Sequence, residues 1–218
     1  MLIHSSSQLL TLQGGPQRGQ RLGDLGIIEN GAVVVRDERI LAVGTTDDLR
    51  LAYPDEPTLD ANRCVVMPGF VDPHTHLVFA GSREREFELR LKGASYMEIH
   101  REGGGILKTV KETRQASEDE LIRNCKRTLD IMLEHGTTTA EAKSGYGLTL
   151  KDESKCLRVI QQIHKTHAVN LVSTFLGAHA IPLEYERNAE DYVRLVVERM
   201  IPSVASARLA EFCDVFCE

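Results

Sequence analysis

The pattern of apolar and polar positions changes about a third of the way along the chain. Before that point, two short runs rich in β-branched residues, 32–35 and 40–43, are separated by a charged segment, which is typical of a β-hairpin. Residues 14–26 contain Gly, Gln and Arg without periodicity and predict a loop. We therefore predict a small β domain over residues 1–63.

After that point, strands alternate with amphipathic helices, the pattern of parallel βα units. The clearest helix begins with Ser117 and Glu120, spaced as a capping box, and ends at Gly136. We predict strands at residues 64–76, 137–143, 169–179 and 212–217, and helices at residues 152–165 and after Asn188, the last one ending with the help of Pro202.

Strands of this kind point to half of an eight-stranded barrel, because a complete barrel takes about 250 residues. The predicted fold class is α/β, with a partial TIM-like (β/α) barrel over residues 64–218 that holds about the first four strands. The small β domain precedes it. We therefore expect this chain of 218 residues to be a truncated fragment.

Composition narrows the class of protein. The chain is 42% hydrophobic and has a net charge of -6, without the cluster of Lys and Arg that a phosphate-binding surface needs. It has no apolar run of about 18 residues and no secretory signal in its first residues. Its five cysteines include no C-x-x-C pair and predict free thiols. These features predict a cytoplasmic protein that binds neither nucleic acid nor a membrane.

The most informative residues for chemistry are His74 and His76. Side chains two residues apart on a strand project to the same side, so both imidazoles could reach one metal ion. The pair lies at the end of the first predicted barrel strand, where barrel enzymes build their active sites. An arbitrary pair at this spacing is more often structural, by about three to one. The surrounding residues reverse that preference.

Residues 67–76 (MPGFVDPHTH), preceded by residues 40–44 (ILAVG), resemble the amidohydrolase superfamily of metal-dependent hydrolases. In that superfamily a small β domain precedes a barrel whose first strand supplies an H-x-H pair for zinc or iron. Later strands supply another histidine and an aspartate. Further segments resemble the imidazolonepropionase family within it: FAGSREREF at 79–87, YMEI at 96–99, GGGI at 103–106, EAKSGYGL at 141–148 and GAHA at 177–180.

This resemblance implies that His74 and His76 bind one ion, Zn²⁺ or Fe³⁺. It also implies that Arg83, Tyr146 and His179 contact the substrate. Without the family, Arg83 would be interpreted as a solvated charge and Tyr146 as a turn residue, and His179 would equally suit a structural role. The catalytic acid and base are unknown in this chain and are expected in a C-terminal half that it lacks.

The reaction implied by the resemblance is hydrolysis of the ring amide of 4-imidazolone-5-propanoate to N-formimino-L-glutamate, a step in histidine degradation. The partner is that small molecule, a homodimer is an option for the whole protein, and the fragment alone is expected to be inactive. Alternatives are another cyclic amidase or an aminohydrolase of the superfamily, such as a guanine deaminase, or a non-catalytic truncated product. Glu141 and Lys143 alternate to one strand face and could pair beneath the substrate, although such pairs are more often a polar layer of the barrel.

Overall fold

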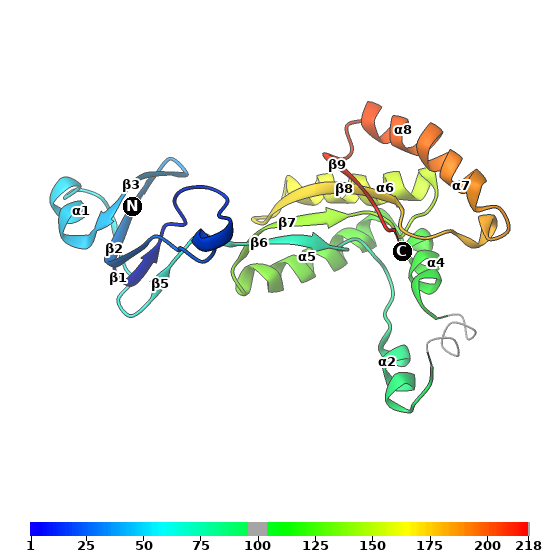
Figure 1. Cartoon of the computed structure of the whole chain (residues 1–218), viewed down its shortest axis with the longest axis horizontal. Coiled ribbons are helices and arrows are strands. Elements are labelled where there is room, and N and C mark those ends of the chain that lie inside the picture. The colour runs from blue at the N-terminus through cyan, green and yellow to red at the C-terminus, as the bar shows by residue number, and fades with distance from the viewer. Residues whose placement is uncertain (96–103, 218) are drawn as a thin grey trace. The chain divides into compact units, whose positions relative to one another are not determined.

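A computed structural model describes residues 1–95 and 104–217 (Figure 1). The YMEI segment at 96–99 and Gly103 lie outside these residues. The chain divides into two compact units, Met1–Gly69 and Phe70–Glu218. None of the helices in the described part of the chain is long and apolar enough to cross a membrane.

The first unit is a five-stranded sheet in which β2 pairs antiparallel with both β1 and β3, while β4 and β5 run parallel to β1. Its strands are β1 (Leu2–Leu10), β2 (Ile27–Arg36), β3 (Arg39–Thr45), β4 (Thr58–Asp60) and β5 (Val65–Val66). A small core of Leu2, Ala32, Val34 and Leu49 lies between the sheet and helix α1 (Thr46–Ala52). The predicted hairpin is confirmed, and its strands extend beyond the predicted runs.

Two features of this unit were not predicted. Strand β1 occupies the first residues of the chain, where a run of serines hides the alternation of buried positions. The predicted end of the β domain at Arg63 leaves out β5, which pairs with β1 through Gln8 and Leu9 and therefore lies with the first unit. The 14–26 segment is mostly loop with one short 3-10 turn, η1 (Gly19–Arg21).

The second unit contains a sheet of four parallel strands in the order β6-β7-β8-β9. The strands are β6 (Phe70–Thr75), β7 (Thr137–Lys143), β8 (Asn170–Ala178) and β9 (Phe212–Val215). The helices are α2 (Glu84–Leu91), α4 (Ile106–Gln115), α5 (Glu118–Glu134), α6 (Leu150–His164), α7 (Ala189–Leu195) and α8 (Ile201–Ser206), with the 3-10 turn η2 (Leu183–Tyr185) and the π-helix η3 (Val196–Met200). Sequential parallel strands joined by helices confirm the predicted half-barrel class.

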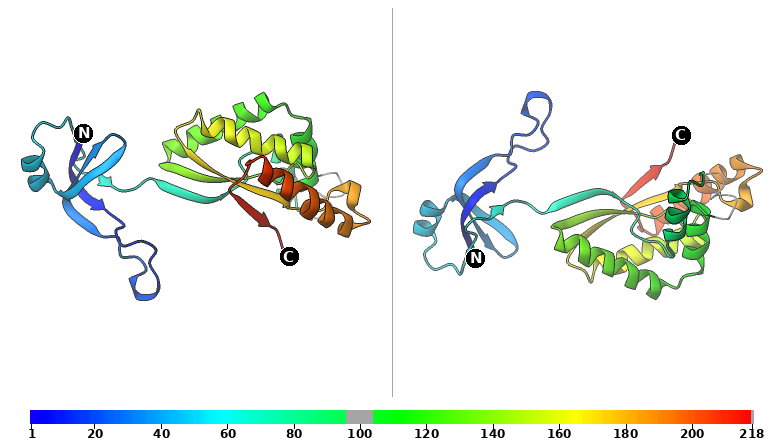
Figure 2. Two further views of the ribbon diagram at one scale, coloured as in Figure 1. Left: turned by 90° about the horizontal axis from the view of Figure 1, so that it is seen from above. Right: turned by 90° about the horizontal axis from the view of Figure 1, so that it is seen from below.

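The core of this unit lies between the sheet and the helices α5 and α6, which cover the same face of the sheet (Figure 2). Strand β7 shows why: Ala140 and Ala142 are fully buried against the helices, while Glu141 and Lys143 point to the opposite face. Ser117 begins α5 by accepting a hydrogen bond from the Glu120 amide, as the capping pattern predicts.

Three sequence predictions need correction. Residues 64–76 form two strands, because the segment around Pro68 between β5 and β6 is not paired. Pro202 does not end the helix that begins after Asn188, since the chain continues through η3 into α8 and Pro202 lies in the first turn of α8. Proline has no amide N–H to donate, and it stands here where the hydrogen-bonding pattern changes from the π-helix η3 to α8. The fourth strand ends at Val215 instead of residue 217.

Candidate active site at the ends of the parallel strands

Four ring side chains meet at the C-terminal ends of three neighbouring strands. His74 lies in β6 and His76 directly follows it, and their ring centroids are 5.4 Å apart. His179 follows β8 and stacks on His76 at 4.6 Å with an interplanar angle of 12°. Tyr146, in the loop after β7, lies 5.4 Å from His76 and 5.2 Å from His179. The structure thus brings four of the five predicted site residues together.

His76 is the most perturbed member of this cluster. Burial lowers the pKa of its imidazole to about 4, helped by repulsion from His179 and His74. Its Nδ1 atom is buried and has no hydrogen-bond partner among the described residues. A neutral imidazole with an unpartnered buried nitrogen has the chemistry of a metal ligand, because metals bind the unprotonated form.

His179 is held by the backbone of the neighbouring loop. Its Nδ1 atom lies 2.9 Å from the Gly145 carbonyl oxygen. A carbonyl oxygen can only accept a hydrogen bond, so Nδ1 is the donor in this contact and carries a proton. Phe216 contacts the same ring, with centroids 6.2 Å apart.

Tyr146 is half-buried beside the two histidines and Phe79. Burial raises the pKa of its hydroxyl, and the positive charge of Arg83 opposes that shift. The phenol is therefore a neutral hydrogen-bond donor near pH 7.

Arg83 is the predicted site residue that lies outside the ring cluster. It precedes α2 as the helix N-cap, and its side chain is 45% exposed. Its Nε atom lies 3.9 Å from Glu86 Oε1, and within the described residues no hydrogen bond joins it to the four rings. Its positive charge lowers the pKa of the Tyr146 hydroxyl, against the larger effect of burial, so the guanidinium lies within electrostatic range of that ring.

A layer of polar side chains lies on the uncovered face of the sheet, in the strands that end at the rings. Lys143 is only 5% exposed, and its Nζ donates to Glu141 Oε1 at 2.6 Å and to Asp214 Oδ2 at 2.8 Å. Thr174 Oγ1 also donates to Glu141, at 2.6 Å. The sequence suggested the pair of Glu141 and Lys143, but Asp214 was not predicted. The feature that could have identified it is a single acidic residue within an otherwise apolar strand.

Two of the ring side chains have the chemistry of metal ligands, but they do not make a complete metal site. In residues 1–95 and 104–217, no group of three or more His, Cys, Asp or Glu side chains is arranged to hold a metal ion. The neighbouring imidazoles of His74 and His76 offer two nitrogen ligands. Zn²⁺ needs at least one more protein ligand for a usual catalytic site.

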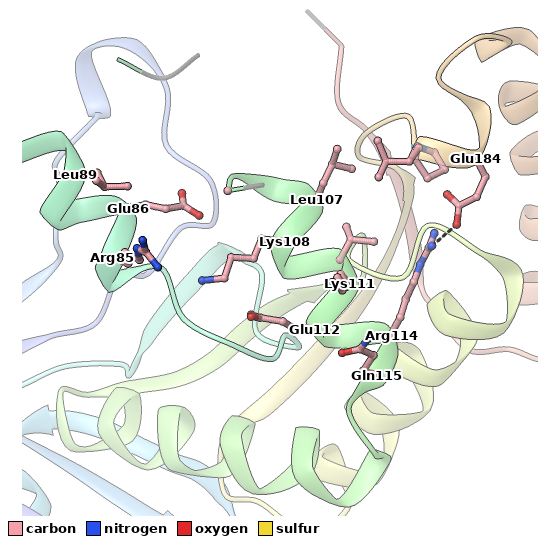
Figure 3. A pocket seen from close by; sticks show the side chains of 14 residues that line it. Arg85, Glu86, Leu89, Leu107, Lys108, Lys111, Glu112, Arg114, Gln115 and Glu184 are labelled. Atoms are coloured by element: carbon pink, nitrogen blue, oxygen red, sulfur yellow. Dashed lines mark hydrogen bonds and ion pairs between the residues drawn. The ribbon is translucent and has the colours of Figure 1, made fainter. Parts of the chain in front are cut away.

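An open cleft lies elsewhere in the second unit. It has a volume of about 900 Å³ between α2, α4 and the residues at 182–184 (Figure 3). Charges of both signs line it, and Arg114 donates to Glu184 across one side at 2.5 Å. None of the four ring residues lines this cleft. The candidate site is therefore assigned from the chemistry of the ring side chains and not from the volume of the cleft.

Two solved structures resemble the fold of most of this chain. A guanine deaminase from Bradyrhizobium japonicum matches 90% of this chain and 40% of its own with a TM-score of 0.54 and 19% identity. An atrazine chlorohydrolase from Arthrobacter aurescens TC1, complexed with zinc, matches 94% of this chain and 42% of its own with a TM-score of 0.53 and 15% identity. The chain therefore shares its fold with part of these two proteins.

Sequence comparison is more specific. A family profile described as "Imidazolonepropionase-like composite domain, bacteria" matches residues 31–55. Imidazolonepropionases of Geobacillus kaustophilus and Shouchella clausii are 51% and 49% identical over the whole of this chain, which covers 53% and 50% of their lengths. The chain thus spans about half the length of the curated relatives it matches. Its resemblance to the imidazolonepropionases is confirmed.

Proposed function

We propose that this chain supplies part of the active site of an imidazolonepropionase, which hydrolyses the ring amide of 4-imidazolone-5-propanoate to N-formimino-L-glutamate. The observation that carries the proposal is the meeting of His74, His76, Tyr146 and His179 at the ends of three strands. The identity of about half of all positions to imidazolonepropionases supports the choice of substrate. Cytoplasmic location and histidine degradation belong to the same proposal.

His74 and His76 would hold one ion, Zn²⁺ or Fe³⁺, together with ligands from outside the described residues. When bound, such an ion supplies Lewis acidity for attack of water on a ring carbonyl. The burial of His76 suits this role, since its imidazole stays neutral at pH 7.

The other residues would bind and orient the substrate. The Arg83 guanidinium suits the propanoate, because its planar fork matches a carboxylate. Tyr146 would donate through its hydroxyl, and His179 would accept at Nε2 from a ring N–H. The buried polar layer of Lys143, Glu141 and Asp214 would form the floor beneath them.

The alternative of a guanine deaminase has weaker support. The guanine deaminase match is 19% identical and shows the fold alone. Guanine also lacks a carboxylate, so it offers no group that matches the Arg83 guanidinium. An isolated, non-catalytic role has no observation in its favour.

The test is a side-by-side assay of the whole protein that carries this sequence, with 4-imidazolone-5-propanoate and guanine as substrates. We expect hydrolysis of the imidazolone only. Arg83→Lys should raise KM, because a point charge replaces a bidentate fork. The fall in kcat/KM should correspond to a loss of about 1–3 kcal/mol of transition-state stabilisation. Arg85→Lys is the matched control, since Arg85 lines the separate cleft. Equal losses in the two variants, or turnover of guanine alone, would reject the proposal.

A further inference from the structure

The loop that carries Tyr146 is fastened by a carboxylate buried beneath it. Glu153, in the first turns of α6, is 0% exposed. Its Oε2 accepts from the Gly145 amide at 2.9 Å, and its Oε1 accepts from the amides of Gly147 at 2.8 Å and Leu148 at 2.7 Å. The hydroxyl of Ser144 adds a further hydrogen bond. One side chain therefore binds the backbone on both sides of Tyr146.

The same loop holds His179. The Gly145 residue whose amide donates to Glu153 also presents its carbonyl oxygen to His179 Nδ1. On the other side of the tyrosine, the Gly147 carbonyl oxygen accepts from Arg114 Nε at 2.7 Å. Movement of this backbone would shift the Tyr146 ring and remove the acceptor that keeps the His179 proton on Nδ1.

We propose that Glu153 is a positioning residue of the candidate site, which sets the place of Tyr146 and the protonated nitrogen of His179 through the Gly145–Leu148 backbone. This role depends on the proposed function in one respect: it takes Tyr146 and His179 to be residues that bind the substrate. The role explains why an acid is buried here. Burial is unfavourable for a carboxyl and raises the pKa of Glu153, and three backbone amides offset that cost only in part.

The glycines of the loop show how little room this arrangement has. Gly145 has a φ of 113°, and a Cβ atom there would lie 2.9 Å from His179 Nδ1. A Cβ atom on Gly147 would lie 2.4 Å from the Glu153 amide nitrogen. The loop backbone therefore packs tightly against both His179 and the start of α6, which leaves it little room to move while Glu153 holds it.

The decisive variant is Glu153→Gln, which keeps the shape of the side chain but points an NH₂ group at amides that also donate. The matched control is Val159→Ala, which removes buried atoms from the same helix without touching the loop. In Glu153→Gln, amide hydrogen exchange at Gly147 and Leu148 should become about tenfold faster than in the control. The ¹⁵N shifts of His179 should move toward a mixture of tautomers, which a loss of core stability alone does not produce.

Binding of imidazole-4-propanoate connects the effect to the site. This unreactive probe carries the ring and propanoate of the proposed substrate, and in the whole protein its affinity should fall about tenfold in Glu153→Gln but not in Val159→Ala. Failure of the unaltered protein to bind the probe would count against the proposed function, while the His179 shifts would still decide the role of Glu153. Unchanged shifts and unchanged exchange in Glu153→Gln would overturn the positioning role.

A measurement on the unaltered protein covers the case in which Glu153→Gln does not fold. If Glu153 holds the loop, the amides of Gly145, Gly147 and Leu148 should exchange as slowly as those in the middle of β7. Exchange at the fast rates of an exposed loop would contradict the proposal without any variant.

Discussion

At the scale of single residues, His76 differs from the other histidines in residues 1–95 and 104–217 because it combines burial with an unpartnered nitrogen. Most buried polar atoms are hydrogen-bonded, so an exception at a strand end needs a ligand to explain it. His135 offers a contrast, because it is exposed and its Nδ1 contacts the Ile131 carbonyl oxygen 2.8 Å away.

We predict that His76→Ala lowers the affinity of the whole protein for Zn²⁺ by about tenfold or more. Loss of a direct ligand should reduce metal affinity at least as much as loss of a residue that hydrogen-bonds to a ligand. His135→Ala should leave the affinity unchanged. Isothermal titration with Zn²⁺ measures both variants under the same conditions. Zn²⁺ binding by His76→Ala at the affinity of the unaltered protein would remove this histidine from the metal site.

Asp214 allows a prediction about pH. Hydrogen bonds from the Lys143 ammonium and the Val215 amide hold the pKa of Asp214 below its usual value of 3.8. A lowered folded-state pKa means that the ionised form stabilises the fold above the unfolded pKa near 4, and that this stability is lost as pH falls through the folded value. The side chain is 42% exposed, so solvent screening keeps the effect small.

Accordingly, Asp214→Asn should unfold at lower urea concentration than the unaltered chain at pH 6, and the difference should shrink as the pH falls below about 4. Tyrosine fluorescence can follow unfolding, because the chain has five tyrosines and no tryptophan. A difference that grows toward low pH would show that the sign is wrong.

The motifs identified the residues that the structure brings together at the site, but they did not identify the residues that support them. His74, His76, Tyr146 and His179 stand in distinctive local sequence, and each follows or ends a predicted strand. Glu153 and Asp214 look like ordinary acids in a helix and a strand, and their partners are known only once separate segments fold together. Sequence patterns report local periodicity, whereas these roles depend on contacts between elements.

At the scale of elements, strands and helices with strong periodicity were predicted closely, and irregular ones were missed. β7 has the predicted bounds because Ala and polar residues alternate in it. α4 was missed because it begins after a glycine, Gly105, without a side-chain cap, and α2 was missed because it buries none of its residues. The continuation of α7 into α8 depends on a π-helix that no local rule predicts.

The loop after β7 provides a prediction at this scale. Gly145→Ala should lower the free energy of unfolding by about 1–3 kcal/mol, because φ is positive and the new Cβ atom would meet both His179 Nδ1 and the Leu176 carbonyl oxygen, which lies 3.0 Å away. Gly93→Ala is the control, since Gly93 also has a positive φ of 90° but has open space around it. Urea unfolding of both variants measures the two losses of unfolding free energy. The loss in Gly93→Ala reports backbone strain alone, so an equal loss in Gly145→Ala would show that the contact with His179 contributes nothing.

At the scale of the whole molecule, the parallel order of the four strands follows from the predicted alternation of strands and helices, since consecutive βα units place successive strands side by side. The second face of this sheet is not covered by helices among the described residues (Figure 2). Val71 pairs with Thr139, and Phe212 pairs with Thr174, so both apolar side chains lie on the face that carries the polar layer. They are 65% and 61% exposed.

The outer strands β6 and β9 each pair with one neighbour in the described sheet, so their free edges can pair with another chain. Exposed apolar side chains beside such edges favour association. We therefore predict that the 218-residue chain self-associates as its concentration rises. Val71→Lys and Phe212→Lys should each shift the association to higher concentration, because a lysine on this face would have to be buried with its charge.

Sedimentation velocity over a hundredfold range of concentration measures this association. Leu51→Lys is the matched control: Leu51 is 85% exposed, but it lies in α1 of the first unit and is not part of the four-stranded sheet. If general surface hydrophobicity caused the association, Leu51→Lys would reduce it as much as Val71→Lys does. If the open sheet causes it, only the two substitutions in β6 and β9 will have an effect, and monomeric behaviour of the unaltered chain at every concentration would refute the prediction.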